Sequence, residues 1–498
     1  MSAYRQLEER FERLAHLSGA AAVLQWDWAA IMPMGGAKAR SRQLAELDVI
    51  RHEIITDTRL AGLLGEAEST RDALNPWQDA NLTEMRHRWT HANALPADLV
   101  AALSTAASEC ELAWRSARAS NDYPTFQKAF ESLLSLVREK AAAKSAAVGL
   151  SNYDALIDSY DPGFTCTEID VFFTDLAVFL PDFLEKVLDK QGALPAPVVP
   201  KGPFPLDKQR TLSRVLMRRL GFDFEHGRLD ESHHPFCGGV SEDVRITTRY
   251  DEVDFTSSLM AVLHETGHAI YERGLPIEWY TQPVGEARSM SLHESQSLLM
   301  EMQICRSNEF FCFAAPLLRQ AFGMADADVA FSPDNLHRLA LRVEPGFIRV
   351  DADEVTYPFH IMLRYRLEKA MIKGDLQASD LPGAWNEGML EFLGLTPETD
   401  RDGCLQDIHW AAGEIGYFPS YTLGALIAAQ LFSSARAQLA DIDNALTSGE
   451  FQDLIAWLGD KVHSQASRYS SHQLIERATG LPLATDAFKA HLGARYLA

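Results

Sequence analysis

The sequence has few basic residues and few cysteines, and it lacks a long apolar run. Its 46 Lys and Arg stand against 69 Asp and Glu, which gives a net charge of -23 over 498 residues. Nucleic acids and anionic membranes require a concentrated basic surface, so we expect neither as a partner. The longest uncharged run, residues 416–435, is interrupted by Pro419 and contains polar side chains. It therefore predicts a buried helix with its entry loop, not a membrane span.

The 6 cysteines show no CxxC spacing and no regular framework. In a chain of this length, such scattered cysteines are typical of reduced thiols. The first residues, MSAYRQLEERFERL, predict a charged amphipathic helix, and they do not resemble a basic and apolar export signal. We therefore expect a cytoplasmic protein.

The hydrophobic content of 47% is enough for a large core, and apolar residues recur at helical spacing through the first 190 residues. Several prolines between residues 195 and 205 predict an extended connector. We expect one domain with an N-terminal helical lobe (1–205), a catalytic region (206–435) and C-terminal helices (436–498). One strand is predicted at 244–250, where it either pairs with an extended peptide substrate or belongs to an ordinary edge hairpin.

The most informative pattern is the HExxH motif formed by residues 264–268, HETGH. His264 and His268 are four residues apart, so they project from one face of a helix and can bind one divalent metal ion. Glu265 is turned by about 100° around the helix axis. Its carboxylate can therefore act as a general base on a water molecule at the metal and then protonate the leaving amine. This arrangement is typical of a metal-dependent hydrolase.

The residues around the motif predict a helix. Asp254 is a good N-cap, apolar residues follow at helical spacing, and Gly274 with Pro276 marks the end. The alternative interpretation is a pair of core histidines without a metal. It is disfavoured, because burial of two histidines and a glutamate without a cation leaves unpaired polar groups.

A catalytic zinc ion needs a third protein ligand and one open position. The tetrad HESQ at residues 293–296 begins a second amphipathic helix, which we expect to pack antiparallel to the first. Glu294 is the predicted third ligand. His293 points about 100° away on that helix and is expected to hydrogen-bond nearby. Glu301 is either a partner of a ligand or a solvated glutamate.

With these residues, the sequence resembles the carboxypeptidase Taq family, which comprises helical metallocarboxypeptidases that act at peptide C-termini. Further motifs carry the resemblance over nearly the whole chain. They are WDW...MP at Trp26, Asp27, Met32 and Pro33; HPF at 234–236; DxRxT at Asp243, Arg245 and Thr247; IRxxAD at Ile348, Arg349, Ala352 and Asp353; and GxxQDxHW at Gly403, Gln406, Asp407, His409 and Trp410.

The resemblance implies a mainly α, large two-lobed fold similar to neurolysin-like and angiotensin-converting-enzyme-like peptidases, with a small antiparallel β-sheet beside a deep active-site cleft. It implies hydrolysis of the C-terminal peptide bond of peptide substrates with broad specificity. It also implies one divalent metal ion per chain and a homodimer. Zinc is the expected metal, with cobalt and manganese as alternatives.

The resemblance also assigns roles to single residues. Arg349 is implied as the anchor for the terminal carboxylate, because a guanidinium pairs with a carboxylate through two hydrogen bonds. The alternative for Arg349 is an ion pair with Asp351 or Asp353. Asp353 is expected to hold Arg349 or a neighbouring loop in place. Tyr421 or His409 is implied as the donor to the tetrahedral oxyanion.

Several of these roles have alternatives. Tyr421 could bind the substrate carboxylate instead of the oxyanion. His234 is implied as a substrate contact, and Arg245 either contacts substrate or forms an ion pair with Asp243. For the GxxQDxHW residues Gln406, Asp407 and Trp410, packing and support of neighbouring side chains are at least as plausible as substrate contact.

Two other functions fit part of the pattern. An oligopeptidase that cuts internal bonds would have a similar helical fold and HExxH motif, and Arg349 argues against it. A metal-stabilised peptide-binding protein without turnover is disfavoured, because Glu265 is intact and a structural zinc usually has four protein ligands.

Overall fold

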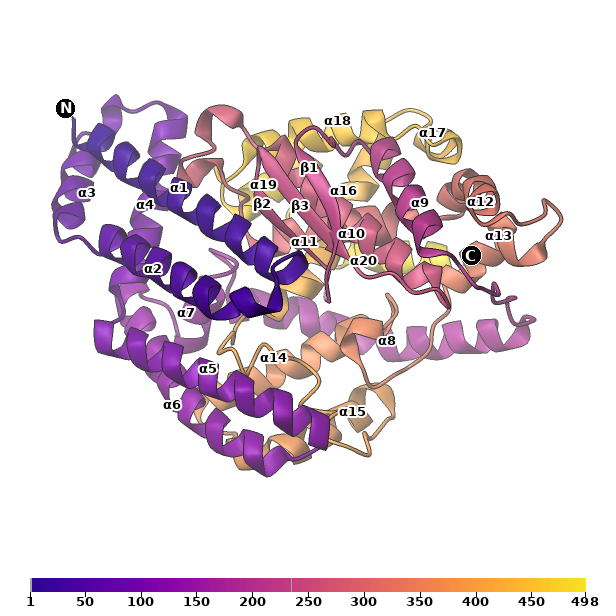
Figure 1. Cartoon of the computed structure of the whole chain (residues 1–498), viewed down its shortest axis with the longest axis horizontal. Coiled ribbons are helices and arrows are strands. Elements are labelled where there is room, and N and C mark those ends of the chain that lie inside the picture. The colour runs from indigo at the N-terminus through magenta and orange to yellow at the C-terminus, as the bar shows by residue number, and fades with distance from the viewer. Residues whose placement is uncertain (1, 234) are drawn as a thin grey trace. The chain divides into compact units, whose positions relative to one another are not determined.

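The computed structural model describes residues 2–233 and 235–498. These residues are predominantly α-helical, and the strands described among them form one small sheet (Figure 1). The expectation of a mainly α fold is therefore confirmed. Within the described residues, no helix is both long and apolar enough to cross a membrane.

The chain divides into two compact units, each of which combines three separate stretches of sequence. The first unit contains Met1–Trp89, Ala196–Leu341 and Gly424–Leu483, and the second contains Thr90–Pro195, Arg342–Leu423 and Ala484–Ala498. Helices α4 (Pro76–Asn93) and α16 (Pro419–Gln438) each contribute residues to both units. The division of the chain into segments at residues 205 and 435 stays a prediction.

The first unit holds the sheet and helix α10 (Phe255–Gly274), which carries the HExxH motif. Its N-terminal helices α1 and α2 lie side by side (Figure 1). Its helices outside the two shared ones are α1 (Ala3–Ala30), α2 (Ala37–Ile55), α3 (Arg59–Ser69), α9 (Leu206–Arg219), α10 (Phe255–Gly274), α11 (Met290–Leu298), α12 (Asn308–Phe322), α13 (Pro333–Ala340), α17 (Ile442–Ser448), α18 (Gln452–Lys461) and α19 (Ser471–Thr479).

The sheet has three strands, β1 (Gly227–Glu231), β2 (Phe236–Val240) and β3 (Asp243–Thr248), in the order β1-β3-β2. β2 and β3 are antiparallel, with Val240 opposite Asp243, whereas β1 pairs with β3 in parallel. The expectation of a wholly antiparallel sheet is wrong. β2 and β3 form an antiparallel hairpin, but β1 adds to the other edge of β3 in parallel, so the sheet is mixed.

The central position of β3 also contradicts the proposed role of residues 244–250. β3 has a neighbouring strand on each side, so its backbone groups are already hydrogen-bonded within the sheet. The hypothesis that this strand pairs directly with an extended substrate is therefore wrong.

Helix α10 begins and ends where the sequence predicts. Asp254 is the N-cap and accepts a hydrogen bond from the backbone of Thr256 at 2.8 Å. The helix ends at Gly274, because Leu275 is extended, as expected for a residue before proline. On its buried face, α10 packs against β3, where Val262 and Ala269 share a core with Val244 and Ile246.

Helix α11 begins at the N-cap Ser289 and continues as a π-helical segment, Leu299–Cys305. Gly267 of α10 lies at the contact between the two helices. A Cβ atom at this position would lie 2.4 Å from the Gln296 carbonyl oxygen. Only glycine allows the two backbones to approach this closely, and the approach brings the HExxH motif against the HESQ tetrad.

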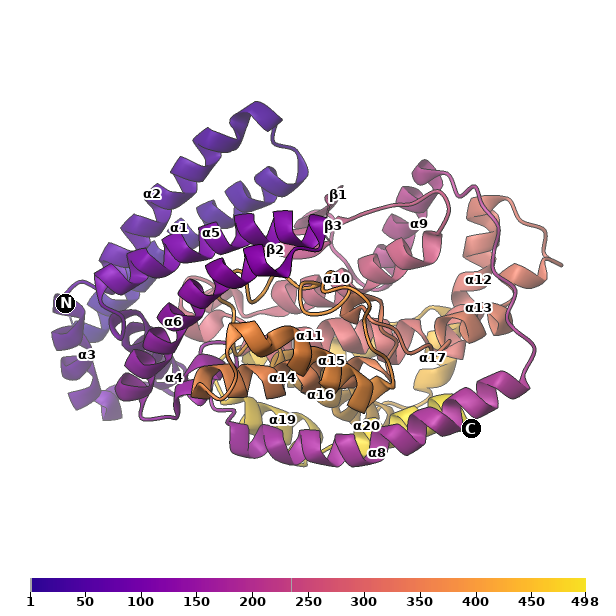
Figure 2. The same ribbon diagram turned by 90° about the horizontal axis from the view of Figure 1, so that it is seen from below.

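The second unit is helical apart from its loops. Helices α5 and α6 pack along each other, and Figure 2 shows them side by side. Besides its parts of α4 and α16, its helices are α5 (Ala97–Ser120), α6 (Tyr123–Val148), α7 (Asn152–Ile157), α8 (Cys166–Ala193), α14 (Tyr357–Lys373), α15 (Leu381–Leu393) and α20 (Asp486–Leu492), followed by a π-helical segment, Gly493–Leu497.

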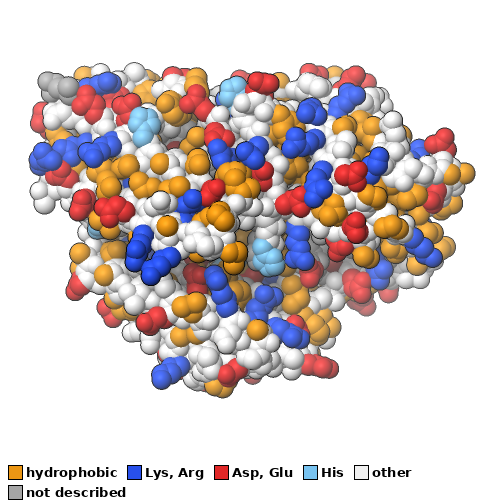
Figure 3. Space-filling view, viewed as in Figure 1, with side chains coloured by type: hydrophobic (Ala, Val, Ile, Leu, Met, Phe, Trp, Pro, Cys, Tyr) orange, Lys and Arg blue, Asp and Glu red, His pale blue; other side chains and the backbone are white. Residues whose placement is uncertain are grey.

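Acidic and basic side chains are interspersed on the face of the molecule drawn in Figure 3. Hydrophobic side chains lie singly or in small groups among them, as is usual for a protein surface. This face therefore does not display a broad basic surface of the kind that nucleic-acid binding requires.

Candidate active site

The structure brings together the three side chains that the sequence predicts as metal ligands. The Nε2 atom of His268 lies 3.5 Å from Glu294 Oε2, and the Nε2 atom of His264 lies 4.0 Å from Glu294 Oε1. One ligand atom from each residue lies within 4.8 Å of the other two. The two histidines come from consecutive turns of α10, and Glu294 comes from α11.

Glu301 fixes the orientation of His264. Its Oε2 atom lies 2.9 Å from His264 Nδ1, and its Oε1 atom accepts a hydrogen bond of 2.7 Å from Arg306. Because Nδ1–H donates to this carboxylate, the ring is held with Nε2 on the side of Glu294. Burial alone would raise the pKa of Glu301, but Arg306 and His264 hold it at about 2. Glu301 is therefore a charged partner of His264 and not a solvated glutamate.

His293 makes contacts beside the three ligands. Its Nε2 atom lies 2.7 Å from Glu272 Oε1 of α10, and its ring stacks on the ring of His268 with centroids 4.5 Å apart. His293 thereby holds the His268 ring in place from the side. These contacts agree with the expected hydrogen-bonding role.

Glu265 is buried beside His264 and Glu294. Its pKa is raised to about 7, first by burial, with nearby Glu294 and Glu301 adding to the rise and His264 opposing it. A carboxyl group with a pKa close to neutrality can both accept and return a proton. A cation at the neighbouring ligands would favour the charged form and lower this pKa.

The donor set fits a divalent metal ion. Two imidazole nitrogens and one carboxylate oxygen converge, and this set with an open fourth position is typical of catalytic zinc. Both histidines and Glu294 are mostly buried, with side-chain exposures of 21%, 12% and 12%. Burial of a carboxylate between two imidazoles is costly without a positive charge, so the site chemistry favours a bound cation.

In the second unit, Arg349 forms a buried ion pair that differs from the one weighed from the sequence. Its Nε and Nη2 atoms donate to Asp407 Oδ1 at 3.1 and 2.8 Å. The other oxygen of Asp407 accepts from Arg364, which is fully buried. One carboxylate therefore lies between two guanidinium groups, and this cluster carries a net positive charge. Asp353 does not pair with Arg349, because it accepts hydrogen bonds from Thr356 and nearby backbone N–H groups.

Tyr421 and His409 lie next to this cluster. The Nε2 atom of His409 is 3.3 Å from the Tyr421 hydroxyl, and the Arg349 guanidinium carbon is 4.9 Å from the centre of the Tyr421 ring. Burial lowers the pKa of His409 to about 4, against the opposing effect of Asp407, so the imidazole is neutral at pH 7. The structure thus groups Arg349, His409 and Tyr421.

Arg245 makes its contacts within the first unit. The guanidinium of Arg245 forms a two-pronged ion pair with Asp243, with Nη2–Oδ2 at 2.6 Å, and lies 4.2 Å from the centre of the Trp26 ring. These contacts match the ion pair with Asp243 that the sequence suggests as the alternative to a substrate contact. His234 lies outside the described residues.

Gln406 and Trp410 support neighbouring residues. Gln406 accepts from the backbone of Arg349 at 2.8 Å, and Trp410 donates to Glu368 at 2.7 Å. Sequence reasoning missed Glu368, which also accepts from Tyr153 and from the backbone of Gly416. A signal was present, since charged residues recur within the otherwise apolar stretch 357–373.

A helical fold in which an HExxH pair meets a glutamate of the next helix defines a metallopeptidase. The family model described as carboxypeptidase Taq (M32) metallopeptidase matches residues 6–496. The chain is 38% identical to thermostable carboxypeptidase 1 of Thermus thermophilus, over 100% of this chain and 99% of that protein. It is 33% identical to carboxypeptidase 1 of Bacillus subtilis, over 96% and 94% of the two chains.

Solved structures agree with this assignment. Trypanosoma cruzi metallocarboxypeptidase 1 superimposes with a TM-score of 0.97 at 41% identity and covers 100% of this chain and 99% of its own. Pyrococcus furiosus carboxypeptidase superimposes with a TM-score of 0.95 at 32% identity, over 100% and 99% of the two chains. The chain belongs to the carboxypeptidase Taq (M32) family and is a metallocarboxypeptidase, a peptide hydrolase.

Proposed function

We propose that this chain removes C-terminal residues from peptides of broad sequence, with Glu265 as general base and Arg349 as the anchor for the terminal carboxylate. The observation that carries the proposal is the charge of the Arg349 cluster. Arg349 and Arg364 share the single carboxylate of Asp407, which leaves positive charge available to a ligand. A free peptide terminus supplies the matching negative charge.

His264, His268 and Glu294 would hold the divalent ion. Zinc is our first choice because of the two imidazoles and one carboxylate, with cobalt and manganese as alternatives. When bound, such an ion supplies Lewis acidity, which polarises the scissile carbonyl and makes water more acidic.

Glu265 handles the proton in this proposal. Its carboxylate takes a proton from the water molecule that attacks the scissile carbonyl, and then delivers it to the amine that leaves. The raised pKa of Glu265 supports both steps, because the group is neither a very weak base nor a very weak acid near neutral pH. Glu265 follows His264 directly in the chain, so α10 fixes its place beside the ligands.

Tyr421 is our proposed donor to the oxyanion, with His409 as its partner. Tyr421 belongs to the second unit together with Arg349, whose guanidinium carbon lies 4.9 Å from the centre of the Tyr421 ring. The resemblance to the family supports a donor at this position. Neutral His409 can hydrogen-bond the Tyr421 hydroxyl and orient its proton.

We also propose a cytoplasmic location and a homodimer. All six cysteines are free thiols, which suits a reducing compartment. The dimer rests on the family resemblance alone and can be tested by light scattering of the purified protein. For Arg245 we propose a structural role, based on its contacts with Asp243 and Trp26.

Three substrates separate the candidate activities. The purified enzyme is incubated with an N-blocked dipeptide, with the same dipeptide as its C-terminal amide, and with a longer internally quenched peptide, with and without a chelator. A carboxypeptidase cleaves the first and not the second, and the chelator abolishes cleavage. Internal cleavage of the quenched peptide with indifference to amidation would support an oligopeptidase. Cleavage of none of the three by metal-loaded protein would support a peptide-binding protein.

A further inference from the structure

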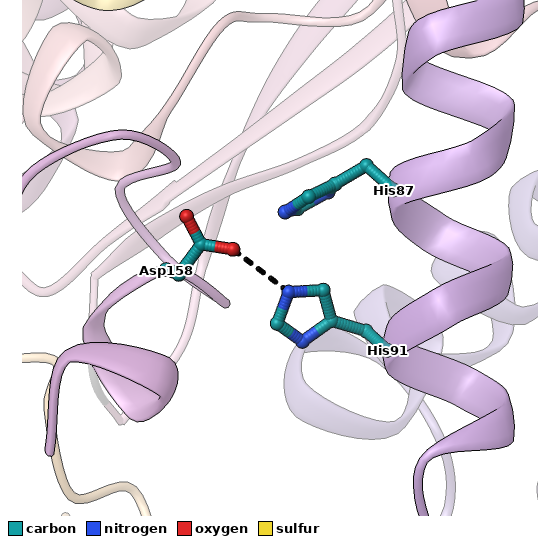
Figure 4. A group of neighbouring side chains, drawn as sticks. All are labelled: His87, His91 and Asp158. Carbon is teal, nitrogen blue, oxygen red and sulfur yellow. Dashed lines mark hydrogen bonds and ion pairs between the residues drawn. The ribbon is translucent and has the colours of Figure 1, made fainter. Parts of the chain in front are cut away.

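A second cluster of metal-ligating side chains lies on α4. His87 and His91 are four residues apart on this helix, so both imidazoles project from the same side, as Figure 4 shows. The Nε2 atom of His91 lies 2.8 Å from Oδ2 of Asp158, which follows the last residue of α7. One ligand atom from each of the three residues lies within 4.8 Å of the other two.

Helix α4 and the second unit together set the relation between the three side chains. His91 and Asp158 both belong to the second unit. His87 is one turn earlier on the same continuous helix, so the helix itself fixes its position relative to His91.

The carboxylate of Asp158 is held in one orientation. Its Oδ1 atom accepts a hydrogen bond of 3.1 Å from the backbone of Gly163, which leaves Oδ2 directed at the histidines. The side chains of His91 and Asp158 are only 10% and 11% exposed. The ligand atoms of His91 and Asp158 are therefore positioned before any ion arrives, which lowers the cost of binding one.

We propose that His87, His91 and Asp158 bind a divalent transition-metal ion, with Zn²⁺ preferred, at a site separate from the catalytic ligands. Two imidazole nitrogens and one carboxylate oxygen are ligands that zinc prefers, and solvent can complete the coordination. In tetrahedral zinc sites, neighbouring ligand atoms are about 3.3 Å apart. His91 and Asp158 therefore need to separate by only a few tenths of an ångström. The ion would displace the Nε2 proton of His91 to solvent, and the Lys144 ammonium would pass a proton to Nδ1 and then accept a hydrogen bond from it as a neutral amine.

A bound ion would have a structural consequence. Asp158 lies at the start of the loop that connects α7 with α8, whereas the two histidines belong to α4. The ion would therefore link α4 to this loop through direct bonds, and it would stabilise the folded chain in proportion to its occupancy.

Lys144 makes this site weaker than the catalytic one. Its Nζ atom lies 3.1 Å from His91 Nδ1 and donates a hydrogen bond of 2.7 Å to Ser159. Burial lowers the pKa of Lys144 to about 7, and the protonated form of the amine opposes a cation on the other side of the same imidazole. The competing interpretation is that Lys144, His91 and Asp158 form only a hydrogen-bonded chain that needs no metal.

The test is the number of Zn²⁺ ions bound per full-length chain. Protein stripped with a chelator is dialysed against Zn²⁺, and bound metal is measured by mass spectrometry. We expect two ions in the wild type and one in His268→Ala, which removes a catalytic ligand. His87→Ala should bind one ion and keep carboxypeptidase activity, and a matched control, His16→Ala at an exposed position of α1, should bind two.

The His268→Ala background keeps the outcome independent of the catalytic proposal, since it reports only the second site. In the His268→Ala background, Asp158→Asn should abolish Zn²⁺ binding. Lys144→Met should lower the Kd for Zn²⁺ about tenfold, because this substitution removes a nearby positive charge. One ion in the wild type with none in His268→Ala would overturn the proposal. An unchanged Kd in Lys144→Met, or full binding in His87→Ala and Asp158→Asn, would contradict the placement of the ion beside His91.

Discussion

Substitution of Arg349 by alanine should weaken catalysis on substrates that end in a free carboxylate. In the structure, Arg349 donates two hydrogen bonds to Asp407 and its guanidinium lies 4.9 Å from the Tyr421 ring centre. Asp407 keeps a second partner, because Arg364 binds its other oxygen at 2.7 Å. Loss of Arg349 therefore does not leave an unpaired buried charge, and the measured effect should report mainly on the substrate.

Truncation of one partner of a buried, hydrogen-bonded charge pair costs about 2 to 5 kcal/mol. Applied to the contact between Arg349 and the substrate carboxylate, this lowers kcat/KM by about 30- to 5,000-fold, at about 1.36 kcal/mol for each factor of ten. Arg349→Lys should recover only part of the loss, because an ammonium group supplies charge without the planar pair of donors.

The assay is a double-mutant cycle between enzyme and substrate. kcat/KM is measured for wild type and Arg349→Ala with a blocked dipeptide and with its C-terminal amide. Both changes break the same contact, so amidation should greatly slow the wild type and add little loss in the variant. Arg245→Ala is the matched control, since its guanidinium pairs with Asp243, and it should respond to amidation as the wild type does. Simple addition of the two losses in Arg349→Ala would refute the anchor role.

Three further predictions concern the metal ligands and the base. Glu301→Gln should weaken metal affinity roughly 10- to 100-fold in a chelator competition, because an amide is a poorer partner for the ligand imidazole; unchanged affinity would show that this contact is dispensable. Gly424→Ala should also weaken metal binding, because its Cβ would lie 2.9 Å from Glu294, whereas Gly459→Ala, with open space around it, should not. The acid limb of kcat/KM should rise with pH as Glu265 loses its proton, with a midpoint between its ordinary pKa of 4.5 and the burial-raised value of about 7, since a bound cation lowers the latter. A pH-independent rate across that interval would contradict the base assignment.

The sequence predicts the local part of the site well, because local rules determine it. The spacing of His264 and His268 needs only helical geometry, and the N-cap Asp254 and the stop before Pro276 set the bounds of α10. The partner helix with Glu294 was identified in the same way. Glu301, which contacts His264, could be placed on the same helix face as Glu294. Its contact with His264 could not be predicted from the sequence.

Contacts between distant segments could not be predicted. Proximity in sequence favoured Asp351 or Asp353 as the partner of Arg349, whereas the partner is Asp407, 58 residues away. Asp353 is engaged locally, since it accepts from Thr356 and the backbone that follows it. A local sequence pattern does not indicate which acidic residue pairs with Arg349 in the folded chain.

The sheet topology and the two compact units could not be predicted either, because both depend on contacts between distant segments. β1 (GRLDE) and β2 (FCGGV) are short and lack a clear apolar alternation, so neither indicates a strand by itself. β1 pairs in parallel with β3, a pairing that only the folded chain defines. Each compact unit also combines stretches from distant parts of the sequence, which composition and linkers do not reveal.

The most direct test of the proposed mechanism is Glu265→Gln, measured for metal content and for turnover of a blocked dipeptide. The amide is nearly isosteric but cannot accept a proton from water, so we expect metal bound at the wild-type level and kcat lowered about 10²- to 10⁴-fold. His264→Ala is the control that should lose the catalytic metal and activity together. Turnover within a few-fold of the wild type by metal-loaded Glu265→Gln would contradict the role of Glu265 as general base.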